Sequence, residues 1–322
     1  GSYDESLSLK IILNSLEQLI GEKVTFSKDW IDGIEFNGNN IVLCENVRFQ
    51  EGEKENSPIL AKKISDLGDV YVFDAFGVSH RKTASTYGVS EYLETFAGDL
   101  LKDEIMNAKK LLSSQKRPMT TIISGAKIST KLTLIKKLIS KSDNIILGGG
   151  ILNTFLKAMG HEIGNSLIEE SFVDEAKEIL NSDDSYKILM PIDVMVSSSS
   201  NLGNPETREI SMVQSNDKIL DIGKKTIDCY NEVITESSTI FWNGPLGYVE
   251  KSPFDNGTIN ISKAIASSQA YSIVGGGDTI PVIESLQLQN KFSCLSTGGG
   301  SLLKFIEGEK LPVLEMLGMY EL

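Results

Sequence analysis

The turn Gly275-Gly276-Gly277-Asp278-Thr279 combines residue types and spacing that could hold a charged ligand. It follows the apolar run 271–274, which predicts a strand, and open α/β sheets bind phosphates beyond the carboxyl ends of their strands. Three glycines let the backbone approach a ligand closely, and a helix beginning at Thr279 would direct unpaired N–H groups at negative charge. The carboxylate of Asp278 in such a turn suggests a metal ion. Taken alone, the motif is equally typical of a turn that only serves geometry.

Two further apolar strands also run into triple glycines, at Gly148–Gly150 and Gly298–Gly300. Three such turns favour a shared ligand. The alternative is close packing of a helix on a strand, which needs small residues at the same places.

Lys127 and Lys131 follow Gly125 in another predicted turn from strand to helix. If the helix begins near Ser129, both ammonium groups can lie on one side of its first turn, an arrangement that suits a polyphosphate. Lysines at the start of a helix oppose its dipole, so an anion is expected there. A solvated helix face is the alternative.

The segment 241–250 ends a predicted strand in a Gly-Pro turn that carries Asn243, Glu250 and aromatic side chains, and it could hold a nucleoside. Arg48 and Arg81 each follow a predicted strand nearer the N-terminus. Their guanidinium groups suit phosphate or carboxylate, although either arginine alone could form an ordinary surface ion pair.

The elements that must position these residues begin with an amphipathic helix over 9–20, which ends at Gly21. Short strands are predicted at 23–26, 41–44 and 70–73, and a helix from Ser57-Pro58 to Gly68 makes the last two a βαβ unit. A long helix over 98–114 has the position and length of a connector between domains.

The rest of the chain alternates between predicted strands and helices, which predicts a parallel sheet. The strands are expected at 119–123, 144–147, 187–190, 239–242, 271–274 and 292–295, and the helices near 129, 152, 170, 226, 261 and 279, with one more at the end. The polar interval 196–218 is interpreted as turns and loop, including 197–200. The apolar tail 311–314 is expected to dock on another part of the chain.

The composition of the chain limits the classes of function that it could have. A chain of 322 residues can form two domains, and a net charge of -13 disfavours wholesale nucleic-acid binding. Cys44, Cys229 and Cys294 are expected to be reduced, buried thiols rather than a disulfide framework or a zinc site, which favours the cytosol. No apolar run approaches membrane-spanning length and no signal peptide opens the sequence.

Several of these segments occur together in an order and spacing that resemble the phosphoglycerate kinase family. The matching segments are 45–49, 74–77, 80–81, 125–127 with Lys131, 242–245, 275–279 and 296–300. The resemblance spans essentially the whole chain and is far more specific than any single glycine motif.

The resemblance implies two Rossmann-like three-layer α/β domains with parallel sheets, joined by a hinge helix. The 3-phosphoglycerate-binding domain would comprise 1–97, incomplete at its N-terminus and completed by the C-terminal tail 309–322. The hinge helix would span 98–114, and 115–308 would form the nucleotide-binding domain. The two domains would close on each other for the reaction.

The resemblance also implies reversible phosphoryl transfer between MgATP and 3-phosphoglycerate, giving 1,3-bisphosphoglycerate and ADP, by a monomeric glycolytic enzyme of the cytoplasm. Asp278 would face Mg²⁺, Glu250 would bind the ribose hydroxyls, and Arg48 and Arg81 would bind the phosphate of 3-phosphoglycerate. The expected nucleotide-binding residues are Gly125, Lys131, Asn243, Glu250, Gly276, Gly277, Asp278 and Thr279. The expected catalytic residues are Lys127, Gly277 and Gly300.

The sequence departs from the family at its start, where the strand with Arg-Val-Asp-x-Asn and the segment Ser-His-Leu-Gly-Arg-Pro do not occur. We therefore expect an incomplete N-terminal domain, and the alternative function is a fragment that binds nucleotide, or a partner, without efficient turnover. A nicotinamide dehydrogenase is a weaker alternative, because no G-x-G-x-x-G follows an early strand.

Overall fold

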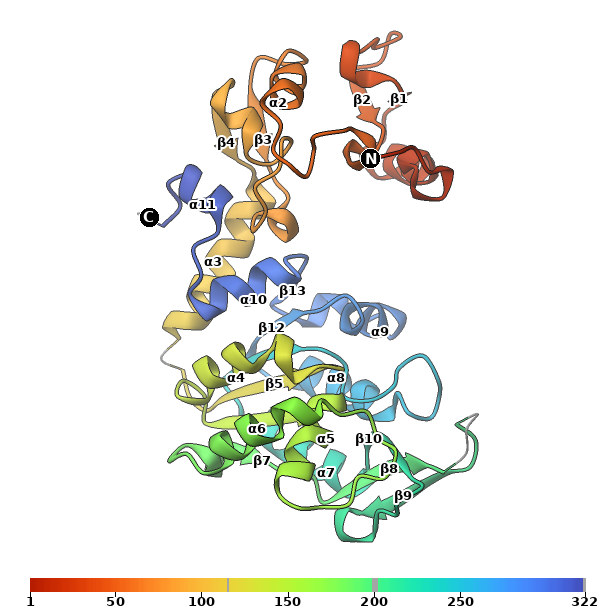
Figure 1. The fold of residues 1–322 in the computed structure, drawn as a ribbon, viewed down its shortest axis with the longest axis vertical. Coiled ribbons are helices and arrows are strands. Elements are labelled where there is room, and N and C mark those ends of the chain that lie inside the picture. The colour runs from red at the N-terminus through yellow and green to blue at the C-terminus, as the bar shows by residue number, and fades with distance from the viewer. Residues whose placement is uncertain (115, 199–201, 321–322) are drawn as a thin grey trace. The chain divides into compact units, whose positions relative to one another are not determined.

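The computed structural model describes residues 1–114, 116–198 and 202–320. The chain divides into two compact units, Gly1–Asp103 with Glu309–Leu322, and Glu104–Gly308. The division falls inside helix α3 (Asp99–Ser113), the helix expected as a connector (Figure 1). Its role as a hinge stays a prediction.

The unit Glu104–Gly308 is built on a six-stranded parallel sheet with the order β13-β12-β11-β5-β6-β7. The strands are β5 (Met119–Ser124), β6 (Asn144–Gly148), β7 (Ile188–Leu189), β11 (Thr239–Asn243), β12 (Tyr271–Gly275) and β13 (Cys294–Ser296). Each predicted strand of this half is present. The chain adds strands in one direction from β5 to β7 and in the other from β11 to β13, so the direction reverses between β5 and β11.

Helices connect these strands, and right-handed crossovers on either side of the reversal place them on opposite faces of the sheet. The helices are α4 (Leu132–Ile139), α5 (Gly149–Ala158), α6 (Val173–Leu180), α7 (Lys224–Glu236), α8 (Asn256–Ser267), α9 (Thr279–Ser285) and α10 (Gly300–Glu307). α5 packs on α6, and α7 packs on α8.

The sheet is buried on both faces, which explains the apolar strands. Phe241 and Trp242 are fully buried in β11. In β5 the buried hydroxyls are paired, since Thr120 shares a 2.7 Å hydrogen bond with Ser237 and Thr121 shares one of 2.7 Å with Ser142. The strand therefore lies in the core in spite of its threonines.

A second sheet in this unit was not predicted. β8 (Asp193–Ser197) pairs antiparallel with both β10 (Lys218–Ile222) and β9 (Pro205–Glu209). The interpretation of 196–218 as turns and loop is therefore wrong for the strand residues 196–197 and 205–209 and for the 3₁₀ helix 210–212, whereas 213–217 form a turn as expected. Residues 199–201 lie outside the described part. β9 is mostly exposed and polar, so its sequence lacks the apolar alternation by which a strand is recognised.

The unit that begins the chain contains two separate two-stranded parallel sheets, β1 (Val24–Ser27) with β2 (Ile41–Cys44), and β3 (Tyr71–Phe73) with β4 (Thr95–Ala97). The strand, helix, strand order through α2 (Pro58–Ser65) is confirmed. The predicted βαβ unit is nevertheless wrong, because β2 and β3 belong to different sheets. Sequence spacing shows the order of strands along the chain but not which strand lies beside which. β4 was missed because its sequence Thr-Phe-Ala holds a single large apolar side chain, Phe96, which is exposed.

The first helix is confirmed in part, since α1 (Leu13–Ile20) ends at Gly21, whose φ of +78° suits a glycine cap. The residues before it form a 3₁₀ turn.

At the other end of the chain, the tail forms α11 (Pro312–Met316), where Val313 and Leu314 are fully buried and the Val313 amide donates to Ser79 O at 3.3 Å. The 3₁₀ helices are η1 (Glu5–Leu7), η2 (Leu9–Ile12), η3 (Trp30–Asp32), η4 (Val47–Phe49), η5 (Phe76–Val78), η6 (Gly88–Glu91), η7 (Ile128–Thr130), η8 (Glu170–Phe172), η9 (Ser185–Lys187), η10 (Ile210–Met212) and η11 (Gln289–Lys291).

The cysteines are free thiols, as expected. The expectation that they are buried is wrong, because Cys229 is exposed on α7 and the other two are half-buried.

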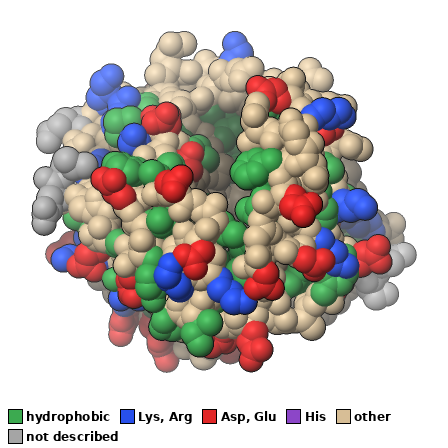
Figure 2. All heavy atoms as spheres, turned by 90° about the horizontal axis from the view of Figure 1, so that it is seen from above, with side chains coloured by type: hydrophobic (Ala, Val, Ile, Leu, Met, Phe, Trp, Pro, Cys, Tyr) green, Lys and Arg blue, Asp and Glu red, His purple; other side chains and the backbone are tan. Residues whose placement is uncertain are grey.

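None of the described helices has the length and apolar character needed to cross a bilayer. Figure 2 shows acidic and basic side chains interspersed with hydrophobic ones on the face that it draws, so that face carries no patch of one sign.

One buried carboxylate organises the turn that precedes α10. Glu104 is 3% exposed and accepts hydrogen bonds from the Ser296 hydroxyl at 2.6 Å, the Thr297 amide at 2.6 Å and the Thr297 hydroxyl at 2.9 Å. This interaction fixes the backbone immediately before Gly298–Gly300.

Replacing Glu104 with alanine should lower the stability of this unit by about 2–3 kcal/mol, because three donors lose a charged acceptor. Hydrogen exchange of the Thr297 amide should accelerate, and the temperature of unfolding should fall. The control is Asp103→Ala, which removes the exposed carboxylate next to it in sequence. Equal effects of the two substitutions would contradict this role of Glu104.

Candidate active site

The reversal point of the six-stranded sheet carries a half-buried lysine, Lys131. The Lys131 ammonium donates to Ser124 O at the end of β5 and to Asn243 O at 3.4 Å at the end of β11. Ligands of open α/β sheets bind where the strand order reverses, because the chain diverges there and leaves a crevice. Lys131 therefore places a cation at the position where this fold binds anions.

The two lysines do not share a helix turn as predicted. Lys127 precedes η7 and Lys131 precedes α4, which begins only at Leu132. A 3₁₀ turn occupies the predicted first turn, and it lets Lys131 fold back onto the strand ends while Lys127 remains exposed. The alternative of a solvated helix face is excluded for Lys131 by its burial.

Burial lowers the pKa of Lys131 from 10.5 to about 8, and the negative charge of Asp278 opposes this shift. The carbonyl oxygens of Ser124 and Asn243 stabilise the ammonium only as dipoles. A bound anion would complete its environment.

The Asn243 side chain connects this lysine to the triple-glycine turn after β12. Its amide nitrogen donates to Gly275 O at 2.7 Å, and the residue is 3% exposed. Gly276 has a φ of +129°, a conformation that L side chains rarely adopt, so glycine is required there. The hydroxyl oxygen of Thr279 is buried in the same turn and has no hydrogen-bond partner among the described residues.

Gly277 and Asp278 are exposed at the start of α9. A Cβ on Gly277 would meet nothing within 4 Å, so packing does not explain this glycine. The Asp278 side chain makes no hydrogen bond to the helix it precedes, which leaves its oxygens available to a cation. The described residues contain no group of three or more side chains arranged to hold a metal. Mg²⁺ needs few protein ligands when it arrives with phosphates and water, and Asp278 fits that requirement.

A pocket of about 220 Å³ at these strand ends brings Gly125, Glu250 and Asp278 together; we call it the strand-end pocket. It is lined by Gly125, Ala126, Gly149, Gly150, Asn153, Leu167, Ile219, Leu220, Pro245, Gly247, Tyr248, Glu250 and Asp278. Glu250 and Asp278 also line an adjacent pocket of about 350 Å³ together with Gly277.

The three triple glycines serve different purposes. A Cβ on Gly149 would lie 2.8 Å from Gly125 O, and one on Gly150 would clash with Ala126 O, so close packing requires these two glycines. Gly300, at the start of α10, has open space around it, as Gly277 has. The packing alternative therefore holds after β6, whereas the turns after β12 and β13 present backbone that a ligand could approach.

The loop that carries Glu250 is held by Asp221 in β10. The Asp221 carboxylate accepts from the Gly257 amide at 2.6 Å and from the Ile222 amide at 2.8 Å. A Cβ on Gly247 or on Gly257 would collide with it, so both ends of the loop pack on this carboxylate. Burial raises the pKa of Asp221 to about 7, although both amide hydrogen bonds oppose the rise.

Some of the expected site residues do not line the strand-end pocket. Neither of the two pockets that contain Asp278 is lined by Lys127, Lys131, Asn243, Gly276, Thr279 or Gly300. Arg48, in η4, and Arg81, after η5, belong to the other unit. Arg81 donates to the His80 ring at 3.1 Å, and in the described part of the chain neither guanidinium forms an ion pair with a carboxylate.

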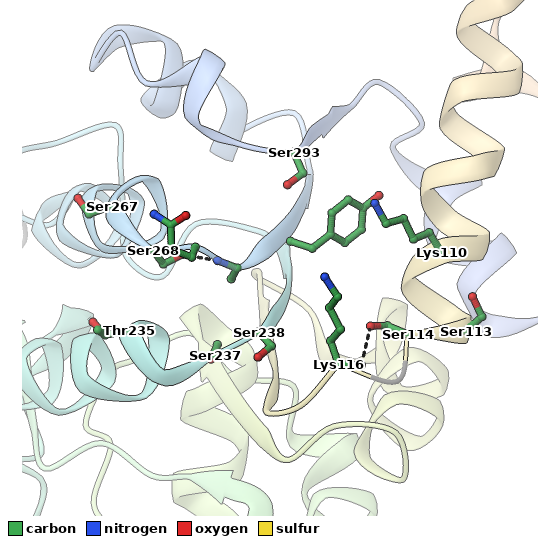
Figure 3. A pocket seen from close by; sticks show the side chains of 13 residues that line it. Lys110, Ser113, Ser114, Lys116, Thr235, Ser237, Ser238, Ser267, Ser268 and Ser293 are labelled. Atoms are coloured by element: carbon green, nitrogen blue, oxygen red, sulfur yellow. Dashed lines mark hydrogen bonds between the residues drawn. The ribbon is translucent and has the colours of Figure 1, made fainter.

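Another pocket of this unit, with a volume of about 700 Å³, lies at the opposite ends of the strands (Figure 3). It contains none of the expected site residues. Most of its hydroxyl groups already donate hydrogen bonds to backbone carbonyl groups. Ser238 donates to Arg117 O at 2.8 Å, and Ser268 donates to Ile265 O at 2.8 Å. Lys110 lies 3.8 Å from the centre of the Tyr271 ring. Size alone therefore does not mark the functional site.

Sequence reasoning missed Asn153, Asp221 and Tyr248 as residues of the site or its support. Asn153 is in the middle of a helix and Asp221 within a strand that was not predicted. Only Tyr248 had a signal, because it belongs to the 241–250 segment already singled out.

Comparison with known proteins gives a consistent result. A family model described as phosphoglycerate kinase matches residues 1–309. A phosphoglycerate kinase of Francisella tularensis is 44% identical over 321 residues, covering 98% of this chain and 82% of the relative. The structure of phosphoglycerate kinase from Coxiella burnetii is 38% identical with a TM-score of 0.84, covering 99% of this chain and 83% of that one. That of Pyrococcus horikoshii OT3 is 29% identical with a TM-score of 0.85, covering 98% and 83%.

The lowered pKa of Lys131 predicts a pH-dependent stability in the absence of ligand. Below pH 8 the folded protein buries a charged lysine, and as the pH rises from about 8 to 10.5 it can lose that proton more easily than the unfolded chain can. The wild type should therefore gain about 3 kcal/mol relative to Lys131→Met over this range. Chemical denaturation at several pH values measures the difference. The exposed Lys136→Met control should show none, and a flat difference for Lys131→Met would contradict the prediction.

Proposed function

The chain belongs to the phosphoglycerate kinase family, and we propose that its nucleotide is ATP, bound with Mg²⁺ at the strand-end pocket. As a member of this family the chain is a phosphotransferase that acts on phosphoglycerate. The observation that best supports the nucleotide position is the buried Lys131 ammonium at the reversal between β5 and β11.

The phosphates of ATP would lie between Lys131 and the turn after β12. Gly276 and Gly277 offer backbone that a phosphate can approach, and the N–H groups at the start of α9 add partial positive charge. Asn243 holds this turn through Gly275 O, and the unpartnered hydroxyl of Thr279 offers a donor. Gly125 lies beside the Lys131 ammonium and lines the strand-end pocket.

Asp278 would hold Mg²⁺ against the phosphates, where the ion would neutralise charge on the nucleotide. Glu250, in the same two pockets, would accept hydrogen bonds from the ribose hydroxyls. Both carboxylates are exposed, so neither is committed to holding the fold.

The acceptor would be the carboxylate of 3-phosphoglycerate, whose phosphate Arg48 and Arg81 would bind on the other unit. In the forward step a carboxylate oxygen forms a bond to the γ-phosphorus as the bond to the β,γ-bridging oxygen breaks, giving 1,3-bisphosphoglycerate and ADP. The two units would have to approach each other for this transfer.

Phosphoryl transfer needs mainly positioning and stabilisation of charge, so no protein nucleophile is required. Lys127, which is exposed beside the Gly125 turn, would meet the moving phosphoryl group. The backbone N–H groups at Gly277 and at Gly300 would stabilise charge on its oxygens. Nothing in the structure favours the alternative of nucleotide binding without turnover.

We also propose a monomer in the cytoplasm. The free cysteines suit a reducing compartment, and the glycolytic role that the family name implies belongs there.

The function is tested by incubating the purified chain with MgATP and 3-phosphoglycerate and coupling the product to a second enzyme. ADP release that depends on 3-phosphoglycerate is expected. If ADP binds but no release occurs, the catalytic proposal fails and the nucleotide site survives. If neither ADP nor ATP binds, both fail.

Lys127→Met should lower kcat by about 100-fold with a smaller effect on the KM for ATP, because the lysine would act mainly on the transferring group. The matched control is Lys136→Met, an exposed lysine on α4. A changed KM with an unchanged kcat would place Lys127 in ground-state binding instead.

Binding of ADP at pH 8 should take up about half a proton, because Lys131 is then half neutral and a phosphate favours its charged form. Calorimetric titration in two buffers with different ionisation enthalpies measures the uptake. Lys131→Met should abolish it, and a binding enthalpy independent of the buffer would argue against contact between Lys131 and phosphate.

A further inference from the structure

Asn153, in the middle of α5, has an incompletely satisfied side chain inside the strand-end pocket. It is 2% exposed and lines that pocket. Its amide nitrogen donates to Leu167 O at 3.0 Å. Its amide oxygen is buried and has no hydrogen-bond partner in the described part of the chain.

The orientation of this amide follows from its surroundings. Reversing the group would set its oxygen against the carbonyl oxygen of Leu167, and two acceptors cannot share a hydrogen bond. The nitrogen must therefore face Leu167, and the atom left over is an acceptor. A buried acceptor without a partner is costly and is rare in folded proteins.

The rest of the lining offers few polar side chains. Besides the carboxylates of Glu250 and Asp278, only Asn153 and Tyr248 contribute one among the described lining residues. Tyr248 is 41% exposed, so its hydroxyl has access to water. The walls near Asn153 come from Leu167 and from the backbone of Gly149 and Gly150, which suit the flat face of a base.

We propose that Asn153 determines which base the site accepts, by receiving a hydrogen bond from the exocyclic amino group of a 6-aminopurine. This rests on the proposed function of the pocket as a nucleotide site. A 6-oxopurine would present an acceptor to the amide oxygen and leave both groups unpaired. The site therefore discriminates adenine from hypoxanthine through one buried group, as sites built to bind a polar substituent do.

The test measures the Kd of three diphosphates by calorimetry on the full chain, so that it does not depend on turnover. ADP carries the amino group, purine riboside diphosphate has hydrogen in its place, and IDP has an oxygen. ADP should bind about tenfold more tightly than purine riboside diphosphate, the size of one buried hydrogen bond, and IDP should bind no better than the latter.

Asn153→Leu should weaken the binding of ADP about tenfold and leave the binding of purine riboside diphosphate nearly unchanged. The preference for ADP over purine riboside diphosphate should therefore disappear. The matched control is Asn231→Leu on α7, because the amide oxygen of Asn231 is likewise buried and without a partner among the residues that the structure describes, but Asn231 does not line the pocket. Asn231→Leu should keep the wild-type preference.

The comparison on the wild type holds even if Asn153→Leu does not fold. Equal affinity for ADP and purine riboside diphosphate would overturn the proposal, as expected if a buried water satisfies the amide oxygen. Equal weakening of all ligands by Asn153→Leu would also overturn it, because the residue would then act only through packing. If none of the three binds, the nucleotide site itself fails, which is a different result from binding without discrimination.

Discussion

The buried ammonium of Lys131 is the constraint on which this site depends. It lies against the last carbonyl groups of two adjacent parallel strands, Ser124 in β5 and Asn243 in β11. Carbonyl dipoles and the nearby Asp278 keep the charge in place but do not compensate for its burial, and the pKa falls to about 8. We propose that an anion completes this site, because a phosphate would supply the missing charge without rearranging the strands.

Under the proposed function, the surrounding groups would let an acidic protein bind a polyanion. A net charge of -13 acts over the whole surface and is screened by salt within about 10 Å. In the proposed site the relevant charges would be the Lys131 ammonium, the N–H groups before α9 and a cation held by Asp278. Local, poorly screened charge decides binding there, whereas net charge decides only which large partners are repelled.

Support for the site comes from buried polar groups that sequence reasoning did not identify. Asp221 holds the loop of Glu250 by packing between Gly247 and Gly257, and Glu104 fixes the turn before Gly298–Gly300. Each carboxylate accepts backbone N–H groups and leaves the neighbouring turn in one conformation. Asn153 differs from them, since its amide oxygen has no partner within the described ranges of the chain.

The sequence by itself determined the alternating strands and helices of the unit 104–308, the strand-to-helix turns with Gly125, Asn243 and Asp278, and the family, because these depend on local patterns and ordered motifs. It could not determine that β2 and β3 lie in different sheets, that the exposed strand β9 exists, or which triple glycine serves packing. Those depend on which backbone lies beside which. Only the tertiary structure showed that Lys131 lies against two strand ends, because β5 and β11 are far apart in the sequence and become neighbours only when the sheet forms.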